Sequence, residues 1–282
     1  MAPSLRAILS YASGFVSQLP LLGSGSVRHV SPYEPLSAAP PCPLDGPVSC
    51  SNSTPVAGDP CCFVHPEGRI VLTQVWDAEV HVLGAEEDWM LQGLWPDRCD
   101  GTASSQPSSP IPQQYTNTTA ILRHHGQDDL LEFIRRYWLT SSPNGPPPIP
   151  QINTLSPVCY PYHPPGLEVI DYLARAASLF RTLDTYRALT RANILPREGA
   201  TYPLARVREA LERVSGGRVV LKCVDGTGDG GKGDVLREVG YVYFVRGSFQ
   251  RGEFVPAQER QGDGGDCAEV VRYLPKRRRR GL

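Results

Sequence analysis

Asp88-Trp89-Met90-Leu91-Gln92-Gly93-Leu94-Trp95-Pro96-Asp97 is the most informative stretch of this 282-residue chain. Taken alone, its apolar residues followed by Trp95-Pro96 predict a buried strand that ends in a turn. Gln92 matters most, because an amide side chain donates and accepts hydrogen bonds but does not exchange protons near neutral pH. Gln92 therefore cannot serve as a general acid or base.

Further segments flank this stretch in a definite order along the chain. Together they resemble fungal members of the ribonuclease T2 family, and the resemblance covers the chain from about Cys42 to Lys276. In that family the central stretch contains His-Gly-Leu-Trp-Pro, and its His handles protons while RNA is cut. Gln92 stands at this His position. The flanking segments are Cys42, Cys50, Cys61-Cys62, Thr73-Gln74-Val75-Trp76-Asp77, Cys99-Asp100-Gly101, Cys159-Tyr160 and Tyr273-Leu274-Pro275-Lys276.

The second active-site motif of the family is missing. Family members carry a segment like Trp-Glu-His-Glu-Trp-x-Lys-His-Gly-Thr-Cys, which supplies a second His, a Glu and a Lys. Here the corresponding region, 141–150, is rich in Ser and Pro and leads straight to Cys159. The family's usual Cys partner in the loop 102–115 is also absent. Loss of the first His, the motif and the distant Cys together favours genuine degeneration, while an exon missed in gene prediction remains the alternative.

The resemblance also implies which residues contact substrate. Family members let a ribose 2'-OH attack the adjacent phosphorus, which gives a 2',3'-cyclic phosphate. Trp95 would stack on a base, Asp97 would hydrogen-bond its edge, and Gln74 would lie near a second base pocket. Ala103 stands where a second stacking Tyr is expected, which weakens the implied base site. The alternative is that Trp95 and Asp97 only hold the turn.

These residues lead to three readings of function, of which we favour the first. It is an RNA-binding or interaction role with lost or strongly reduced cleavage. The second is an active endoribonuclease that gives 2',3'-cyclic phosphates, and the third is a scaffold-only interaction protein without RNA contact. None of the six His residues stands at a family catalytic position, and we expect no metal, no cofactor, no membrane span and a monomer. The net charge of −1 gives no global bias towards nucleic acid, so RNA affinity would come from a local site.

Cysteine usage and the chain ends indicate a compartment. Eight Cys residues suggest disulfides and an oxidising environment. The resemblance implies the pairs Cys42–Cys62, Cys50–Cys99, Cys61–Cys159 and Cys223–Cys267. Glycosylation sequons at Asn52 and Asn117 fit secretion or vacuolar delivery.

The expected domain organisation is simple. Residues 1–26 would form a signal peptide with an interrupted apolar run, 27–41 a linker, 42–276 one domain of the T2 type, and 277–282 a basic tail. The plain interpretation of the tail is a solvated segment; phosphate contact, a nuclear address and proteolytic trimming are alternatives.

Apolar periodicity predicts an α+β fold. The resemblance to the T2 family implies a T2-like fold, with a central antiparallel sheet packed with helices and linked by disulfides. Expected helices are Asp128–Leu139, Leu167–Leu183, Thr185–Asn193 and Pro203–Val214, the last with Pro at an early helical position. Expected strands are Arg69–Val75, Trp89–Leu91, Val219–Cys223 and Val239–Val245, with shorter pieces near Phe254 and Tyr273.

Overall fold

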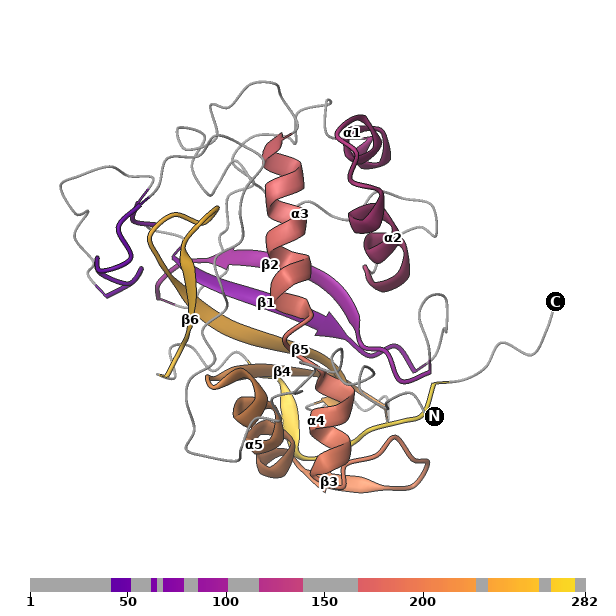
Figure 1. The fold of residues 1–282 in the computed structure, drawn as a ribbon. Coiled ribbons are helices and arrows are strands. Elements are labelled where there is room, and N and C mark those ends of the chain that lie inside the picture. Colours follow the sequence, from indigo (N-terminus) through magenta and orange to yellow (C-terminus); the bar gives the residue numbers. More distant parts are fainter. Residues whose placement is uncertain are drawn as a thin grey trace, which may run out of the picture.

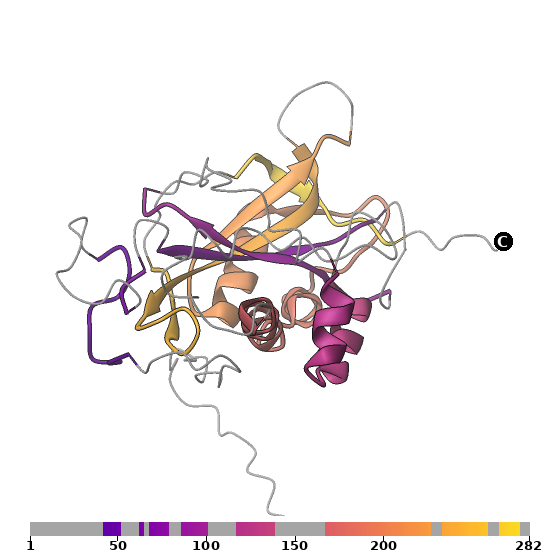
Figure 2. The same ribbon diagram turned by 90° about the horizontal axis from the view of Figure 1, so that it is seen from above.

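The computed structural model describes residues 42–51, 62–64, 68–78, 86–100, 117–138, 167–226, 233–258 and 265–276. It has an α+β architecture in which helices lie against one face of a twisted sheet (Figures 1 and 2). The helices are α1 (Thr118–His124), α2 (Asp128–Tyr137), α3 (Leu167–Phe180), α4 (Thr185–Arg191) and α5 (Leu204–Ser215). The strands are β1 (Arg69–Val75), β2 (Met90–Asp97), β3 (Thr201–Pro203), β4 (Val219–Val224), β5 (Gly233–Arg246), β6 (Glu253–Pro256) and β7 (Cys267–Arg272).

The long strand β5 organises the sheet, since it pairs with β1, β4, β6 and β7. The main strand order is β2-β1-β5-β7-β3, so β2 lies at an edge. The sheet is antiparallel, as expected, except that β5 and β7 run parallel. This arrangement puts the stretch around Gln92 on an edge strand, where one row of backbone groups has no neighbouring strand.

The main core lies between the sheet and the helices. Successive strand residues point to opposite faces, so Ile70 and Leu72 of β1 enter this core while Val71 joins a smaller cluster on the other face. Helix α3 crosses the middle of the core, and its Ile170 and Leu173 are fully buried. Burying such aliphatic side chains contributes about 1.5–3 kcal/mol each, which makes α3 the main cover of the sheet.

The helix boundaries follow from local chemistry. The side chain of Asn117 accepts the backbone N–H of Ala120 at 3.0 Å and so begins α1, and Asp184 does the same for Arg187 at the start of α4. Helix α5 ends at Gly216, whose φ of 73° is in the left-handed region that glycine adopts without strain.

The structure corrects several expectations from the sequence. Helix α1 and strand β3 were not expected, and β2 and β5 are both longer than predicted. The sequence predicts Pro203 inside a helix, but this residue ends β3 and caps α5, because its ψ of 128° is extended. The last strand ends at Arg272, one residue before Tyr273.

Three disulfides link the described residues: Cys42–Cys62, Cys50–Cys99 and Cys223–Cys267. These match the pairing implied by the family resemblance. The fourth expected pair, Cys61–Cys159, lies outside the described residues. The Cys223–Cys267 bridge joins β4 to β7 across the central strand β5, while Cys50–Cys99 ties the N-terminal segment to the end of β2.

Candidate functional site

Gln92 occupies a β-bulge at the edge of the sheet. Thr73 of β1 pairs with Gly93 and the next residue, Gln74, pairs with Leu91, so Gln92 is the extra residue on β2. A bulge re-aims the side chain of the extra residue and increases the local twist, and bulges are frequent beside active sites. The position that the sequence motif singles out therefore has a special backbone geometry.

The free edge of β2 is held by side chains from two helical segments. The indole Nε1–H of Trp138, directly after α2, donates to the carbonyl of Gln92 at 3.1 Å. The hydroxyl of Tyr172 on α3 accepts the backbone N–H of Leu94 and donates to its carbonyl, both at 3.0 Å. Burial raises the pKa of Tyr172 well above its ordinary value, so the hydroxyl keeps the proton it donates. These contacts satisfy backbone groups that an edge strand would otherwise expose.

Trp95 and Asp97 lie on the face of the sheet opposite the helices, because they pair with Val71 and Arg69 of β1. The ring of Trp95 lies against Gly93, where a Cβ would approach three ring atoms to 3.0–3.1 Å. A side chain at position 93 would therefore push the indole away. Trp95 is only partly buried.

The carboxylate of Asp97 forms a 2.5 Å ion pair with the buried guanidinium of Arg69. Burial raises the pKa of Asp97, and the charge of Arg69 partly opposes this rise. The pair uses one carboxylate oxygen, Oδ2, of a side chain that remains partly exposed. Asp97 thus combines a structural ion pair with an oxygen that could accept a hydrogen bond.

Gln74 lies apart from Trp95 and Asp97, because its side chain points to the opposite, helix-covered face of the sheet. Its side chain is fully buried. The amide nitrogen donates to the carbonyl of Leu183 at 3.2 Å, and the amide oxygen accepts the hydroxyl of Thr185 at 2.7 Å. The structure therefore brings Trp95 and Asp97 together but places Gln74 elsewhere.

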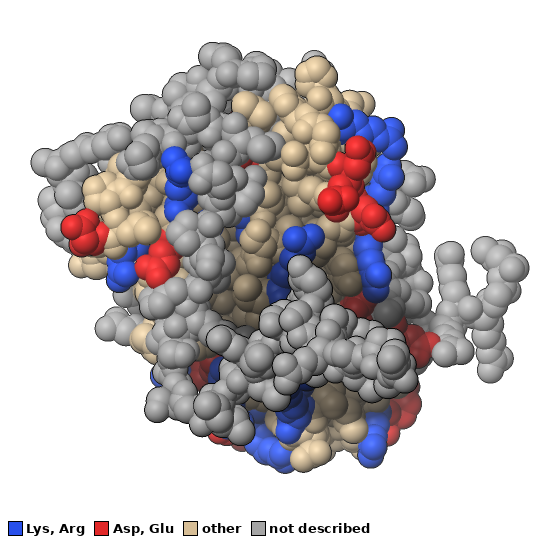
Figure 3. Space-filling model, in the orientation of Figure 1, with Lys and Arg blue, Asp and Glu red and all other residues tan. Residues whose placement is uncertain are grey.

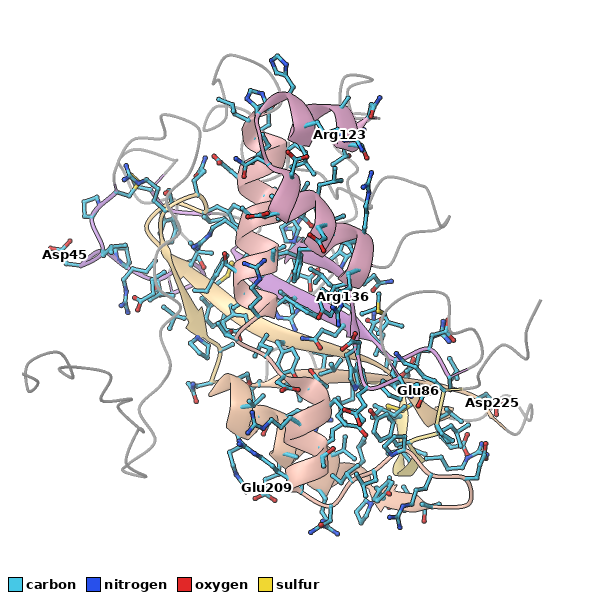
Figure 4. The ribbon with its side chains drawn as sticks, turned by 45° about the vertical axis from the view of Figure 1, so that its right-hand side comes forward. Asp45, Glu86, Arg123, Arg136, Glu209 and Asp225 are labelled. Carbon is cyan, nitrogen blue, oxygen red and sulfur yellow. A yellow bond between two sulfur atoms is a disulfide. The ribbon has the colours of Figure 1, made fainter. Side chains whose placement is uncertain are left out.

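A pocket of about 470 Å³ lies where Gln74 meets α2, α3 and α4. Its walls include Trp89, Phe180 and Tyr186, with Asp88 and Glu87 at its border. Aromatic walls with a few polar groups are typical of sites that hold planar ligands. Arg136, at the end of α2 in Figure 4, lies 3.8 Å from the carboxylate of Asp88, one of the lining residues.

The base of this pocket is held by the C-terminal segment. The ammonium of Lys276 lies 4.4 Å from the centre of the Trp76 ring and donates to the carbonyl of Asp88. Burial lowers the pKa of Lys276, although the charges of Asp88 and Asp77 oppose that change. The indole N–H of Trp89 donates to the hydroxyl of Tyr273 at 3.0 Å. The closing segment 273–276 thus fixes Trp89 in the pocket wall.

Sequence reasoning did not identify Trp138, Tyr172 or Arg69 as part of the site. Each acts on a residue far along the chain; Tyr172 is 78 residues from Leu94 and Trp138 is 46 from Gln92. No local pattern reports such contacts, because they depend on how helices pack on the sheet. The one sequence signal for these contacts was the residue type, because buried Trp and Tyr side chains usually form a hydrogen bond.

Other expected features are placed as follows. The side chain of Asn117 is exposed at the start of α1, and Asn52 lies outside the described residues, as does the region 139–166 that replaces the second motif. His124 and His125 adjoin each other at the end of α1, with ring centres 4.9 Å apart. Among the described residues there is no group of three His, Cys, Asp or Glu that could hold a metal ion. No helix in the described ranges is both long and apolar enough to cross a membrane.

Comparison with known proteins agrees with this architecture. The sequence model of the Ribonuclease T2 family matches residues 68–257. The chain belongs to the ribonuclease T2 family. Among the family's characterised fungal members, Ribonuclease T2 of Aspergillus oryzae is 35% identical over 252 residues, which cover 84% of this chain and 85% of that protein. Ribonuclease Trv of Hypocrea rufa is 37% identical over 244 residues, which cover 84% of this chain and 98% of that protein.

The fold is also shared with a solved T2 ribonuclease, Actibind, described as an antitumorigenic agent. The two structures superpose with a TM-score of 0.68 at 30% identity, over 84% of this chain and 99% of Actibind. The two fungal relatives are thus similar to this chain in sequence, and Actibind is similar to it in fold.

Proposed function

We propose that this T2-family protein binds single-stranded RNA and has lost, or strongly reduced, the ability to cleave it. The observation that carries the proposal is Gln92 on the bulge of β2, at the position where family members carry a catalytic His. An amide can hold a phosphate oxygen by a hydrogen bond but cannot transfer a proton. One positioned acid or base contributes roughly 10² to 10⁴ fold to the rate, so its loss alone would bring cleavage close to background.

The second part of the proposal, retained RNA binding, rests on Trp95 and Asp97. The partly exposed ring of Trp95 offers a stacking surface, and stacking on an aromatic ring contributes about 1–3 kcal/mol per base. Asp97 offers an acceptor beside it, already oriented by Arg69. Strand β2 also carries Gln92, while Trp89, just before β2, lines the aromatic pocket on the helix-covered face of the sheet.

Binding is tested by the affinity of the disulfide-intact protein for a short single-stranded RNA, measured by fluorescence anisotropy. We expect Trp95→Ala to weaken binding by about 10-fold and Trp95→Phe, which keeps an aromatic ring, to weaken it less. Val270→Ala changes an exposed side chain on β7 and serves as the control. Equal affinity of the parent and Trp95→Ala would remove the RNA site and favour an interaction role of the scaffold alone.

We also infer that the protein is secreted or delivered to a vacuole. The three disulfides support this, because such bonds persist in oxidising compartments. Asn117 is exposed and its side-chain oxygen caps α1, which leaves its amide nitrogen available for a glycan. Treatment with an endoglycosidase should lower the mass of protein recovered from the culture medium or vacuole. Recovery only from the cytosol would contradict the inference.

A further inference from the structure

A second cavity, of about 660 Å³, opens on the helical side of the molecule, between the end of α3, helix α4 and the end of α5. Its walls carry Arg181, Arg187 and Arg191, and the buried Tyr243 of β5 contributes to its lining. Figure 3 looks onto this side, where Lys and Arg side chains lie in the middle of the face and over its lower helices. None of the residues that the sequence assigns to RNA cleavage or base contact lines this cavity.

The three arginines form a concentrated positive charge. Arg187 and Arg191 are one turn apart on α4 and so share one side of that helix. Arg181 follows α3, and its guanidinium lies 4.7 Å from the centre of the Phe133 ring. Within the described ranges, none of the three forms an ion pair with a carboxylate. Guanidinium groups that share a cavity repel one another, and a phosphate that bridges them would relieve this repulsion.

One carboxylate also borders the cavity. Asp184 lies in the wall, but its Oδ1 accepts the backbone N–H of Arg187 at 3.0 Å as the cap of α4. The negative charge of Asp184 thus interacts with the N-terminus of α4. With three Arg residues and one Asp in its lining, the cavity has a net positive charge.

The cavity adjoins the aromatic pocket described above. Arg181, Leu183 and Asp184 line both of them. A base held against the partly buried Tyr186 in the aromatic pocket would have Arg181 in the same pocket wall, and Arg187 and Arg191 line the adjoining cavity. Aromatic surfaces that stack bases, next to basic side chains that follow the backbone, are the recurrent arrangement for binding single-stranded nucleic acid.

We propose that the cavity lined by Arg181, Arg187 and Arg191 binds a backbone phosphate of an RNA strand that extends from the aromatic pocket. This inference rests on the proposed RNA binding and adds to it a phosphate site on α4. Arginine suits the role, because its planar guanidinium forms paired hydrogen bonds with phosphate oxygens.

The test compares two double variants that remove equal charge. Arg187→Gln with Arg191→Gln empties the cavity of two guanidinium groups. Arg123→Gln with Arg135→Gln removes two exposed arginines from α1 and α2, and Figure 4 shows Arg123 at the opposite end of the molecule from α5, which carries Glu209. All four side chains are exposed, so both variants should fold, which thermal melting would verify.

We measure the affinity of each variant and of the parent for a single-stranded RNA oligonucleotide across a range of salt concentrations. The cavity variant should bind about 10-fold more weakly than the control variant. Its slope of log affinity against log salt should fall by about 0.7 for each phosphate that the variant no longer neutralises. A cavity variant that matches the control in affinity and slope would overturn the inference.

The same experiment separates this inference from the proposed function. If the parent binds RNA and Trp95→Ala loses affinity while the cavity variant does not, the phosphate site is wrong and RNA binding at β2 stands. If the parent itself does not bind RNA, both are wrong.

Discussion

The indole nitrogen of Trp138 donates a 3.1 Å hydrogen bond to the carbonyl oxygen of Gln92, 46 residues earlier in the chain. This bond fixes the bulge of β2 to the end of α2. Trp138 is fully buried, and its backbone also pairs with Leu91. The edge strand that carries Gln92 is thus tied to the core of the protein through Trp138.

Trp138→Phe should destabilise the protein, because it leaves the Gln92 carbonyl without its donor. Loss of a partner of this kind costs about 1–3 kcal/mol, and the smaller ring adds a cavity. Urea unfolding followed by circular dichroism measures the change. Tyr172→Phe is the matched comparison, since it removes only a hydroxyl that bonds to Leu94. If both variants keep the free energy of unfolding of the parent, the edge is not held as we describe.

Gly93→Ala should displace the ring of Trp95. The added methyl would approach three ring atoms to 3.0–3.1 Å, which is closer than a relaxed contact. RNA affinity should therefore fall towards that of Trp95→Ala, while folding is retained. Gly199→Ala provides a test of alanine strain alone, because that residue has open space around its Cβ position but a φ of 73°. Unchanged RNA affinity in Gly93→Ala would show that the ring position is not required.

The pair Asp234–Arg272 should stabilise the protein above acidic pH. The two groups form hydrogen bonds of 2.7 and 2.9 Å, and the bond from Arg272 holds the pKa of Asp234 below its ordinary value of 3.8. A lowered pKa in the folded state means that the contribution is present above pH 3.8 and is lost as the pH falls through the lower folded value.

Asp234→Asn should therefore cost about 1 kcal/mol or less at neutral pH, and the difference from the parent should shrink at the acid end. Thermal melting between neutral and strongly acidic pH measures it. Glu209→Gln, which breaks the exposed pair with Arg213, should show a smaller effect. A difference that grows as the pH falls would contradict the assignment.

The sequence predicted some parts of this structure well and others poorly. Strand β1 has the predicted bounds, Arg69–Val75, because its apolar run is bounded on both sides. Helix α1 was missed, since seven residues carry little periodicity and its stability comes from the Asn117 cap and packing against α2. The length of β5 depends on pairing with four other strands, which no local pattern reports.

The candidate site shows the same division. Gln92, Trp95 and Asp97 were found from one contiguous motif on β2, and the structure places them on one strand. Gln74, expected near a second base pocket, lines the aromatic pocket, where its amide nitrogen bonds to Leu183 and its amide oxygen to Thr185. These hydrogen bonds depend on how α4 packs against β1, which the local sequence does not specify.

Gln92→His should not restore full ribonuclease activity. The imidazole returns one proton-transfer group, but the second motif, with its His, Glu and Lys, remains absent from the sequence. Groups that act as a unit lose most of their effect when one is missing. Cleavage should rise by less than the roughly 10² fold that a fully supported acid or base contributes. A larger gain would show that displaced groups supply the missing chemistry.

The most direct test of the account is RNA cleavage by the purified, disulfide-intact protein at mildly acidic and neutral pH, with products examined for 2',3'-cyclic phosphate ends. Trp95→Ala, purified in parallel, reports any contaminating nuclease. We predict RNA binding without cyclic phosphate product above that control. Cleavage that appears in the parent and disappears in Trp95→Ala would contradict the loss of catalysis.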